Sequence, residues 1–424
     1  MPAWQQPCGL LLCLASGYIL SVKYFSDCHF HTLSLSDPDF PALLSSLSGP
    51  SGKLLDKLTS DYLLTPELFK EDNLQKTLEN TLNAICRPVG ESLLLMEEDL
   101  KGSYGGKSFI QHGRFRLRDM EFDKILLVPL VLDFTACPGR EQRTYYPAYS
   151  KDRLTISAQA ALEGIHHYYS QAPDGLFEFY PFLGLNTRAH SMEALQDFLD
   201  KHINTSHEMH PDHTVPDKPF YGIKLYPPLG FHPWPEDKEE REKCCYLYEF
   251  CSYYQIPMIT HTDDQGFRGV GLEEAWAATS PETWKKALEH YPGLIIDFAH
   301  FGKQYALRSK SGAESLARRY RGLPDSPWLY SILALMDEYP GVYADLSFSG
   351  AERSFYQELY ALLMEKESPV ITRILFGTDF PVSLLKCSSY SSCFSVWEDS
   401  PFSDGEIEEI AGANALRFLG FADR

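Results

Sequence analysis

The chain has 424 residues, a formal net charge of −20 at pH 7, and 44% hydrophobic and 13% aromatic residues. This composition is typical of a folded globular protein and excludes a largely disordered one. The acidic balance argues against nucleic acid or an anionic membrane as a general partner, because both need a positively charged face. The length fits one large domain or two ordinary ones.

Short apolar segments recur along the chain, rich in β-branched and aromatic residues and separated by longer amphipathic segments. Because these runs are apolar throughout instead of alternating, they predict strands covered on both faces, as in a parallel sheet with helices outside. The predicted strands are 22–31, 122–134, 175–187, 220–228, 256–262, 293–302, 341–347 and 373–381.

The amphipathic segments predict helices at 152–171, 191–203, 236–255, 281–291, 326–340 and 352–367. Ser191 is a candidate N-cap, and Pro281 stands at a first helical position, where its missing N–H costs nothing. The alternation of strand and helix, with eight strands, predicts an α/β protein with a (β/α)8 TIM barrel over residues 1–424, in preference to an open doubly wound sheet.

The alternation breaks between the first two strands, over residues 36–121, which hold helical candidates and the turn GSYGGK. Long insertions after barrel strands lie at the C-terminal mouth, so we expect a large helical insertion after strand 1 that forms a lid or pocket wall. A separately folded second domain is the alternative. The segment 201–219 is rich in His and Pro, and the irregular spacing of its histidines favours an exposed loop over a second metal site.

The apolar segment 8–22 resembles the core of a signal peptide, but no Lys or Arg precedes it, and it is shorter than a membrane span requires. A strand or hairpin at the base of the barrel is the preferred interpretation. The ten cysteines show no CxxC spacing, and a chain of this size needs no covalent cross-links. Both observations favour reduced thiols in a cytoplasmic protein without a membrane partner.

Histidines and an aspartate stand at the ends of several predicted strands. His29 and His31 are two residues apart on the first strand, so both imidazoles point to the same side. An HxH pair alone is a weak signal. However, His261, His300 and Asp379 end the fifth, sixth and eighth strands, and the C-terminal ends of barrel strands converge on one mouth. Histidines that merely pack in a core would fall anywhere on the strands.

The motifs DCHFH, KLYPPLGFHP, ITHTD, DFAHFG, FGTDFP and NALRFLG, in this order and placement, resemble the metal-dependent amidohydrolase superfamily in its amidohydrolase-related (family 2) branch. The resemblance covers about residues 24 to 420, apart from the segment after strand 1. It implies one divalent ion, with Zn²⁺ the expected metal, bound by His29, His31, His261 and Asp379. Such an ion would lower the pKa of water toward about 7.

The resemblance also implies catalytic roles. Asp379 would accept the proton of the attacking water and pass it to the leaving group. His300 would act as a ligand, an acid–base partner or an oxyanion donor. The structural alternatives are a helix N-cap for Asp379 and a hydrogen-bonded core histidine for His300.

Lys224 ends the fourth strand, and a charged lysine facing a barrel mouth is costly unless it is paired. Three interpretations stay open for it. It contacts the substrate beside a single metal, it is carbamylated and bridges two metals, or it forms a structural ion pair. Tyr226, Arg188 and Arg268 are further candidates for substrate contacts. Asp345 and Ser347 end the seventh strand and face the same region.

The leading hypothesis is a metal-dependent hydrolase that cleaves a C–N or C–O bond (amide, lactone or ester) of a small polar substrate. The alternative is a non-oxidative decarboxylase of an unsaturated or aromatic carboxylic acid on the same metal site. Many decarboxylating relatives replace the first HxH histidine with Glu, so His29 favours hydrolysis. A barrel used only as a binding scaffold predicts missing ligands, and none is missing. Relatives often pair, so a homodimer stays open.

Overall fold

A computed structural model of the chain describes residues 22–33, 84, 87–135, 137, 153–264, 266, 268–304, 327–366 and 369–422. The predicted base segment 8–21 and the predicted helical candidates before Ala84 lie outside this part. Among the described helices, none has both the length and the apolar character that crossing a bilayer requires.

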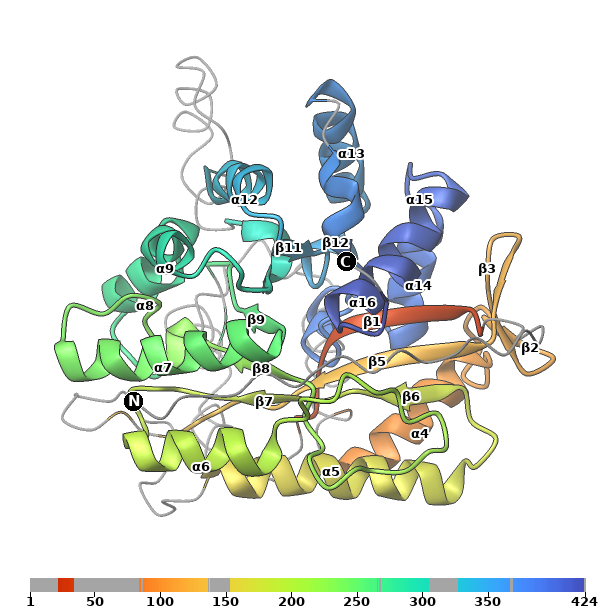
Figure 1. Ribbon diagram of the computed structural model, residues 1–424. Helices are drawn as coiled ribbons and strands as arrows, with labels where there is room; N and C mark the ends of the chain where they lie inside the picture. Colours follow the sequence, from red (N-terminus) through yellow and green to blue (C-terminus); the bar gives the residue numbers. More distant parts are fainter. Residues whose placement is uncertain are drawn as a thin grey trace, which may run out of the picture.

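The central sheet is a nearly closed barrel of parallel strands in the order β1-β5-β7-β8-β9-β10-β11-β12, and β6 also pairs with β5 (Figure 1). β6 and β7 are two halves of one predicted strand. The strands are β1 (Tyr24–His31), β5 (Lys124–Leu130), β6 (Phe177–Phe179), β7 (Phe182–Gly184), β8 (Gly222–Leu225), β9 (Met258–Thr260), β10 (Ile296–Phe298), β11 (Val342–Asp345) and β12 (Ile374–Leu375). The predicted TIM barrel is confirmed.

The first and last strands meet through main-chain contacts that close the sheet. The backbone N–H of Cys28 donates to the carbonyl of Phe376 at 2.8 Å, and that of His31 donates to the carbonyl of Phe380 at 2.7 Å. Parallel strands in a closed barrel all end on the same side. These contacts therefore hold His31 and the loop after β12 at the same end of the barrel.

Helices surround the barrel (Figure 1). They are α4 (Val89–Leu100), α5 (Arg153–Gln171), α6 (Met192–His202), α7 (Lys238–Tyr254), α8 (Leu272–Thr279), α9 (Lys285–His290), α12 (Pro327–Glu338), α13 (Arg353–Lys366), α14 (Tyr390–Glu398), α15 (Asp404–Glu408) and α16 (Asn414–Phe418). Their apolar faces pack on the outward side chains of the strands in one continuous core. Ser191 caps α6, accepting a hydrogen bond from the Ala194 N–H, as predicted.

The described part of the predicted insertion holds one helix and a small sheet. α4 packs between α5 and α14, in the place of the first outer helix of the barrel. It is followed by a small antiparallel sheet of β2 (Ile110–Gln111), β3 (Arg114–Leu117) and β4 (Met120–Phe122). This sheet leads directly into the start of β5, and so lies near the N-terminal end of the barrel. A lid role for residues 36–83 stays a prediction.

The interior of the barrel is apolar at its base and polar toward its mouth. At the base, Phe418 of α16 packs inside the ring, with its ring centroid 6.1 Å from that of Phe182 and 5.1 Å from that of Tyr343. Lys224, Asp297 and Asp345 stand on three strands among otherwise apolar buried neighbours. Buried charged side chains require polar or charged partners. These three residues therefore indicate a polar site at the mouth of the barrel.

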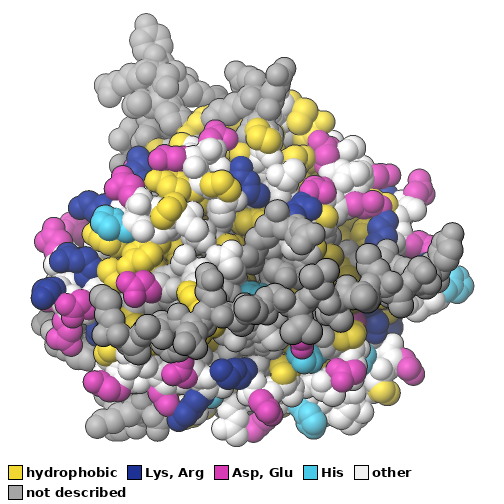
Figure 2. Space-filling model, viewed as in Figure 1, with side chains coloured by type: hydrophobic (Ala, Val, Ile, Leu, Met, Phe, Trp, Pro, Cys, Tyr) yellow, Lys and Arg dark blue, Asp and Glu magenta, His cyan; other side chains and the backbone are white. Residues whose placement is uncertain are grey.

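The outer surface shows no gathering of one sign of charge on the face in Figure 2. Acidic and basic side chains of the described residues are interspersed there. The described residues of this face therefore form no broad positive surface of the kind that nucleic acid requires.

Candidate metal centre

His29, His31 and Asp379 meet at the mouth of the barrel, although they come from its first and last strands. The Asp379 carboxylate Oδ1 lies 3.5 Å from His29 Nε2 and 3.2 Å from His31 Nε2. All three side chains are buried. The backbone of Asp379 has a positive φ of 59°, in the left-handed region, which turns its side chain back toward the strand ends.

The hydrogen bonds on the far side of each imidazole fix where its proton lies. His31 Nδ1 lies 3.3 Å from the carbonyl oxygen of Leu130, and His29 Nδ1 lies 2.6 Å from Asp345 Oδ2. These oxygens accept, so each ring carries its proton on Nδ1 and a lone pair on Nε2. Burial, followed by the positive charge of Lys224, lowers the pKa of His29 to about 4 and that of His31 well below its usual value. Both rings are therefore neutral at pH 7.

These atoms fit a divalent cation. The unprotonated Nε2 atoms of His29 and His31 both face Asp379 Oδ1. This oxygen is buried and has no hydrogen-bond partner. A tetrahedral ion about 2.0–2.1 Å from each ligand would hold its ligand atoms about 3.3 Å apart. The observed separations of 3.2 and 3.5 Å match that spacing.

His261 belongs to a second group of potential ligands, with Asp263 and His300. His261 Nδ1 lies 3.1 Å from His300 Nε2, and its Nε2 lies 3.1 Å from Asp263 Oδ1. The His300 ring in turn lies 4.9 Å from the His29 ring, between centroids. The structure thus brings three of the four predicted ligands together and links His261 to them through His300.

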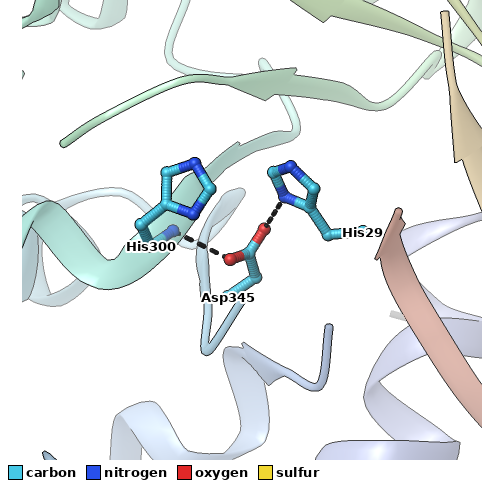
Figure 3. Close-up of side chains that lie close together, drawn as sticks. All are labelled: His29, His300 and Asp345. Atoms are coloured by element: carbon cyan, nitrogen blue, oxygen red, sulfur yellow. Dashed lines mark hydrogen bonds and ion pairs between the residues drawn. The ribbon is translucent and has the colours of Figure 1, made fainter. Parts of the chain in front are cut away.

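His300 follows β10 and also adopts left-handed backbone, with φ of 63°. Its ring is buried, and burial lowers its pKa to about 4, against the opposing effect of Asp263 and Asp379. Its amide N–H donates to Asp345 Oδ1 at 2.8 Å, while the other oxygen of the same carboxylate accepts from His29 (Figure 3).

Lys224 on β8 reaches the same group of side chains. Its ammonium Nζ lies 3.3 Å from His29 Nε2, and the side chain is buried. Burial lowers the pKa of Lys224 to about 8, although Asp345 and Asp379 favour its charged form. The ring of Tyr226 stacks on that of His261, with centroids 4.4 Å apart. Lys224 and Tyr226 therefore both border the candidate centre.

The two predicted arginine contacts differ in their surroundings. Arg188 forms ion pairs with Glu240 at 2.8 Å and Glu274 at 3.1 Å, and donates to the carbonyl of Gly230. These partners occupy its guanidinium, and its predicted role as a substrate contact stays a prediction. Arg268 is buried in the loop after β9.

That loop approaches the centre closely at Gly266. A Cβ added to Gly266 would lie 2.3 Å from the Tyr226 hydroxyl oxygen and 3.1 Å from His261 Nε2. The φ of Gly266 is also positive, at 108°. Only glycine fits both requirements, so the backbone here forms part of the wall around His261.

Three buried aspartates were not singled out from the sequence. Asp263 follows His261 by two residues in ITHTD, a spacing that could have identified it. Asp297 on β10 has a pKa raised well above its usual value by burial and by Asp345. The Asp27 carboxylate accepts hydrogen bonds from the backbone N–H of Thr378 at 2.9 Å, from the Thr378 hydroxyl at 2.7 Å and from the Tyr390 hydroxyl at 3.0 Å. It joins the first strand to the loop that carries Asp379.

A cavity of about 400 Å³ lies between α4 and the segment after β12. Its lining includes Met96, Asp99, Phe380 and Tyr390. α4 therefore forms one wall of this cavity, and Phe380, which directly follows Asp379, lies on the opposite wall.

Comparison with known proteins identifies the family. The amidohydrolase family model matches residues 213–421, about half of the chain. This segment includes Lys224, His261, His300 and Asp379, whereas the HxH pair lies outside it. No curated protein matches the chain at a significant level.

Solved structures similar to this chain include a probable 2-pyrone-4,6-dicarboxylic acid hydrolase from Acinetobacter baumannii, with 13% identity and a TM-score of 0.44 over 94% of this chain and 99% of that chain. A 5-carboxyvanillate decarboxylase from Novosphingobium aromaticivorans, with bound manganese, has 12% identity and a TM-score of 0.49 over 96% and 99%. An amidohydrolase from Burkholderia multivorans, with bound zinc, has 13% identity and a TM-score of 0.41 over 94% and 99%. At these values the likeness says nothing about the reaction. The family match shows that the chain is a member of the amidohydrolase family of metal-dependent enzymes.

Proposed function

We propose that the chain is a hydrolase that cleaves a C–N or C–O bond (amide, lactone or ester) in a small polar substrate. The proposed ligands of a divalent cation, zinc in the first instance, are His29, His31, His261 and Asp379. The observation that carries the proposal is the convergence of two neutral imidazole lone pairs on the buried Asp379 Oδ1. A divalent cation in such a place polarises a carbonyl and lowers the pKa of water.

The proposed roles of the protein's own groups follow from their positions. The Asp379 carboxylate accepts the proton of the attacking water and delivers it to the leaving nitrogen or oxygen. His300 is neutral at pH 7, and its imidazole assists proton transfer or donates a hydrogen bond to the developing oxyanion. We propose that Lys224 binds a polar group of the substrate, with Tyr226 and Arg268 as further substrate contacts. We propose that Arg188, through its ion pairs with Glu240 and Glu274, holds these elements together in place of the predicted substrate contact.

The test is made on protein stripped of metal with a chelator and reloaded with zinc or manganese. Turnover is measured on a panel of amides, lactones, esters and unsaturated or aromatic acids. Release of carbon dioxide would assign decarboxylation in place of hydrolysis. Lack of any metal binding by the intact protein would reject the metal site itself.

The decisive variant is Asp379→Asn, because asparagine tolerates the left-handed backbone at this position and changes only the charge and proton affinity. General acid–base groups contribute about 10²- to 10⁴-fold to rate, so we expect turnover to fall at least about 100-fold. Circular dichroism checks that the fold is retained. Near-normal turnover of this variant at full metal occupancy would contradict the mechanism.

A further inference from the structure

Asp345 connects two histidines of the candidate centre from the end of β11. Its Oδ2 accepts from His29 Nδ1 at 2.6 Å, and its Oδ1 accepts from the backbone N–H of His300 at 2.8 Å (Figure 3). The carboxylate is fully buried. The Asp345 side chain therefore connects the His29 ring on β1 to the backbone of His300, which follows β10.

Ser347 completes the network on the other side of the same carboxylate. Its backbone N–H donates to Asp345 Oδ1 at 3.0 Å, and its hydroxyl donates to the same oxygen. The Ser347 Oγ also lies 3.1 Å from His29 Nδ1 and 2.9 Å from His300 Nδ1. Both Asp345 oxygens are thus occupied by protein donors.

Asp345 lies on the side of His29 away from the proposed metal ligand atom. It contacts Nδ1 of His29, whereas Asp379 faces Nε2 on the opposite side of the ring. A carboxylate on Nδ1 fixes the tautomer and the ring orientation and makes the Nε2 lone pair a better ligand. The hydrogen bond to the backbone N–H of His300 also offsets part of the cost of the left-handed backbone there.

We propose that Asp345 is a positioning residue that raises the affinity of the centre for its cation by locking His29 and the His300 backbone, with Ser347 as its partner. This inference rests on the metal site of the proposed function. It adds a residue that touches neither the ion nor the substrate but on which the ligand geometry depends.

Asp345→Asn separates this role from simple packing. The amide has nearly the same shape but only one acceptor oxygen, so it cannot accept from His29 and from the His300 and Ser347 amides together. The matched control is Asp133→Asn. The Asp133 carboxylate accepts from His190 Nε2 at 2.7 Å and is also buried, but it contacts none of the proposed ligands.

The measurement is zinc affinity by competition with a chromogenic chelator, with the melting temperature of each metal-free protein as the check on folding. Loss of a carboxylate partner behind a metal-bound histidine weakens binding about 10- to 100-fold, and we expect that loss in Asp345→Asn. Asp133→Asn should keep wild-type affinity. If Asp345→Asn does not fold, Ser347→Ala serves instead, with a smaller loss of affinity expected from its contacts with both rings.

The outcomes are distinguishable. Wild-type affinity in a folded Asp345→Asn protein, or in Ser347→Ala where that variant serves instead, would overturn the inference while leaving the metal site intact. Equal weakening in Asp345→Asn and Asp133→Asn would also overturn it, because a general loss of rigidity would then explain both. Absence of zinc binding by the wild-type protein would reject the proposed function, and this inference with it.

Discussion

The backbone N–H of Asp379 donates to the carbonyl oxygen of His29 at 2.7 Å. The two residues that form this main-chain link at the seam of the barrel are also two of the proposed ligands. The geometry of the site and the closure of the sheet are therefore coupled, and substitutions along this seam should affect both.

Gly377→Ala tests the coupling. A Cβ at position 377 would lie 2.7 Å from His29 Cβ and 3.1 Å from Ser347 Cβ, so either His29 or the strand must move. Overpacking of this kind costs about 1–3 kcal/mol. We expect a lower free energy of unfolding in urea together with weaker zinc binding.

The control for that substitution is Gly405→Ala in α15, where an added Cβ meets no heavy atom within 4 Å. Its zinc affinity should match the wild type, and its stability should equal the wild type or exceed it by up to about 1 kcal/mol, because alanine favours a helix over glycine. Unchanged zinc affinity in Gly377→Ala would show that the seam and the site are independent.

Lys224→Ala distinguishes the two metal models. With a pKa of about 8, Lys224 is largely an ammonium at pH 7 and suits a substrate contact. Hydrogen bonds to charged groups contribute about 1.5–3 kcal/mol, so we expect KM to rise about tenfold or more with the metal content unchanged. Elemental analysis and steady-state kinetics measure the two quantities.

Lys243→Ala is the matched lysine control, because Lys243 is also buried but donates to the carbonyl of His190 at 2.9 Å, outside the centre. Its KM should not change. A fall in the number of ions per chain in Lys224→Ala would instead support a carbamylated lysine that bridges two metals.

Arg188→Gln tests whether this arginine is structural. Its ion pairs with Glu240 and Glu274 would be lost, and we expect a loss of about 1–3 kcal/mol in stability with KM unchanged. Glu240→Gln, which removes one of these partners, should lower stability in the same direction. A raised KM in Arg188→Gln at wild-type stability would restore the substrate-binding role predicted from the sequence.

The buried thiol of Cys244 predicts sensitivity to alkali. Burial raises its pKa from 9.0 to about 12, so the folded protein keeps this proton where the unfolded chain has released it. Its stabilising contribution is complete below pH 9 and declines as the pH rises toward 12. Between pH 9 and 11 the wild type should lose about 2–3 kcal/mol more than Cys244→Ala in urea unfolding. Parallel pH profiles would contradict this assignment.

The sequence predicted the barrel well because each strand lies in a short, largely apolar run, a pattern that depends on local composition alone. The small sheet after α4 was missed, since strands such as Arg114–Leu117 mix charged and apolar residues over only four positions. Helix α4 was recognised as helical but assigned to an insertion, because the distance along the chain from β1 hides that it packs as an ordinary outer helix.

For the site, strand ends were a sound guide to which side chains approach one another, and His29, His31 and Asp379 do meet. Their role as ligands stays a prediction. The link between Asp345 and His29 could not be foreseen, because it depends on how β11 faces β1 across the barrel. Nor could the sequence show that Arg188 is occupied by two glutamates from later helices.

His300 and Asp379 both adopt backbone conformations that non-glycine residues avoid, and the surrounding barrel must hold them there. Because strained positions persist only where the surrounding structure holds them, a weakened fold releases them more readily than it loses regular helices and strands. A mildly destabilised variant can therefore remain abundant and helical while having lost its chemistry. Cellular protein level alone would then be a poor measure of whether a variant of this enzyme still works.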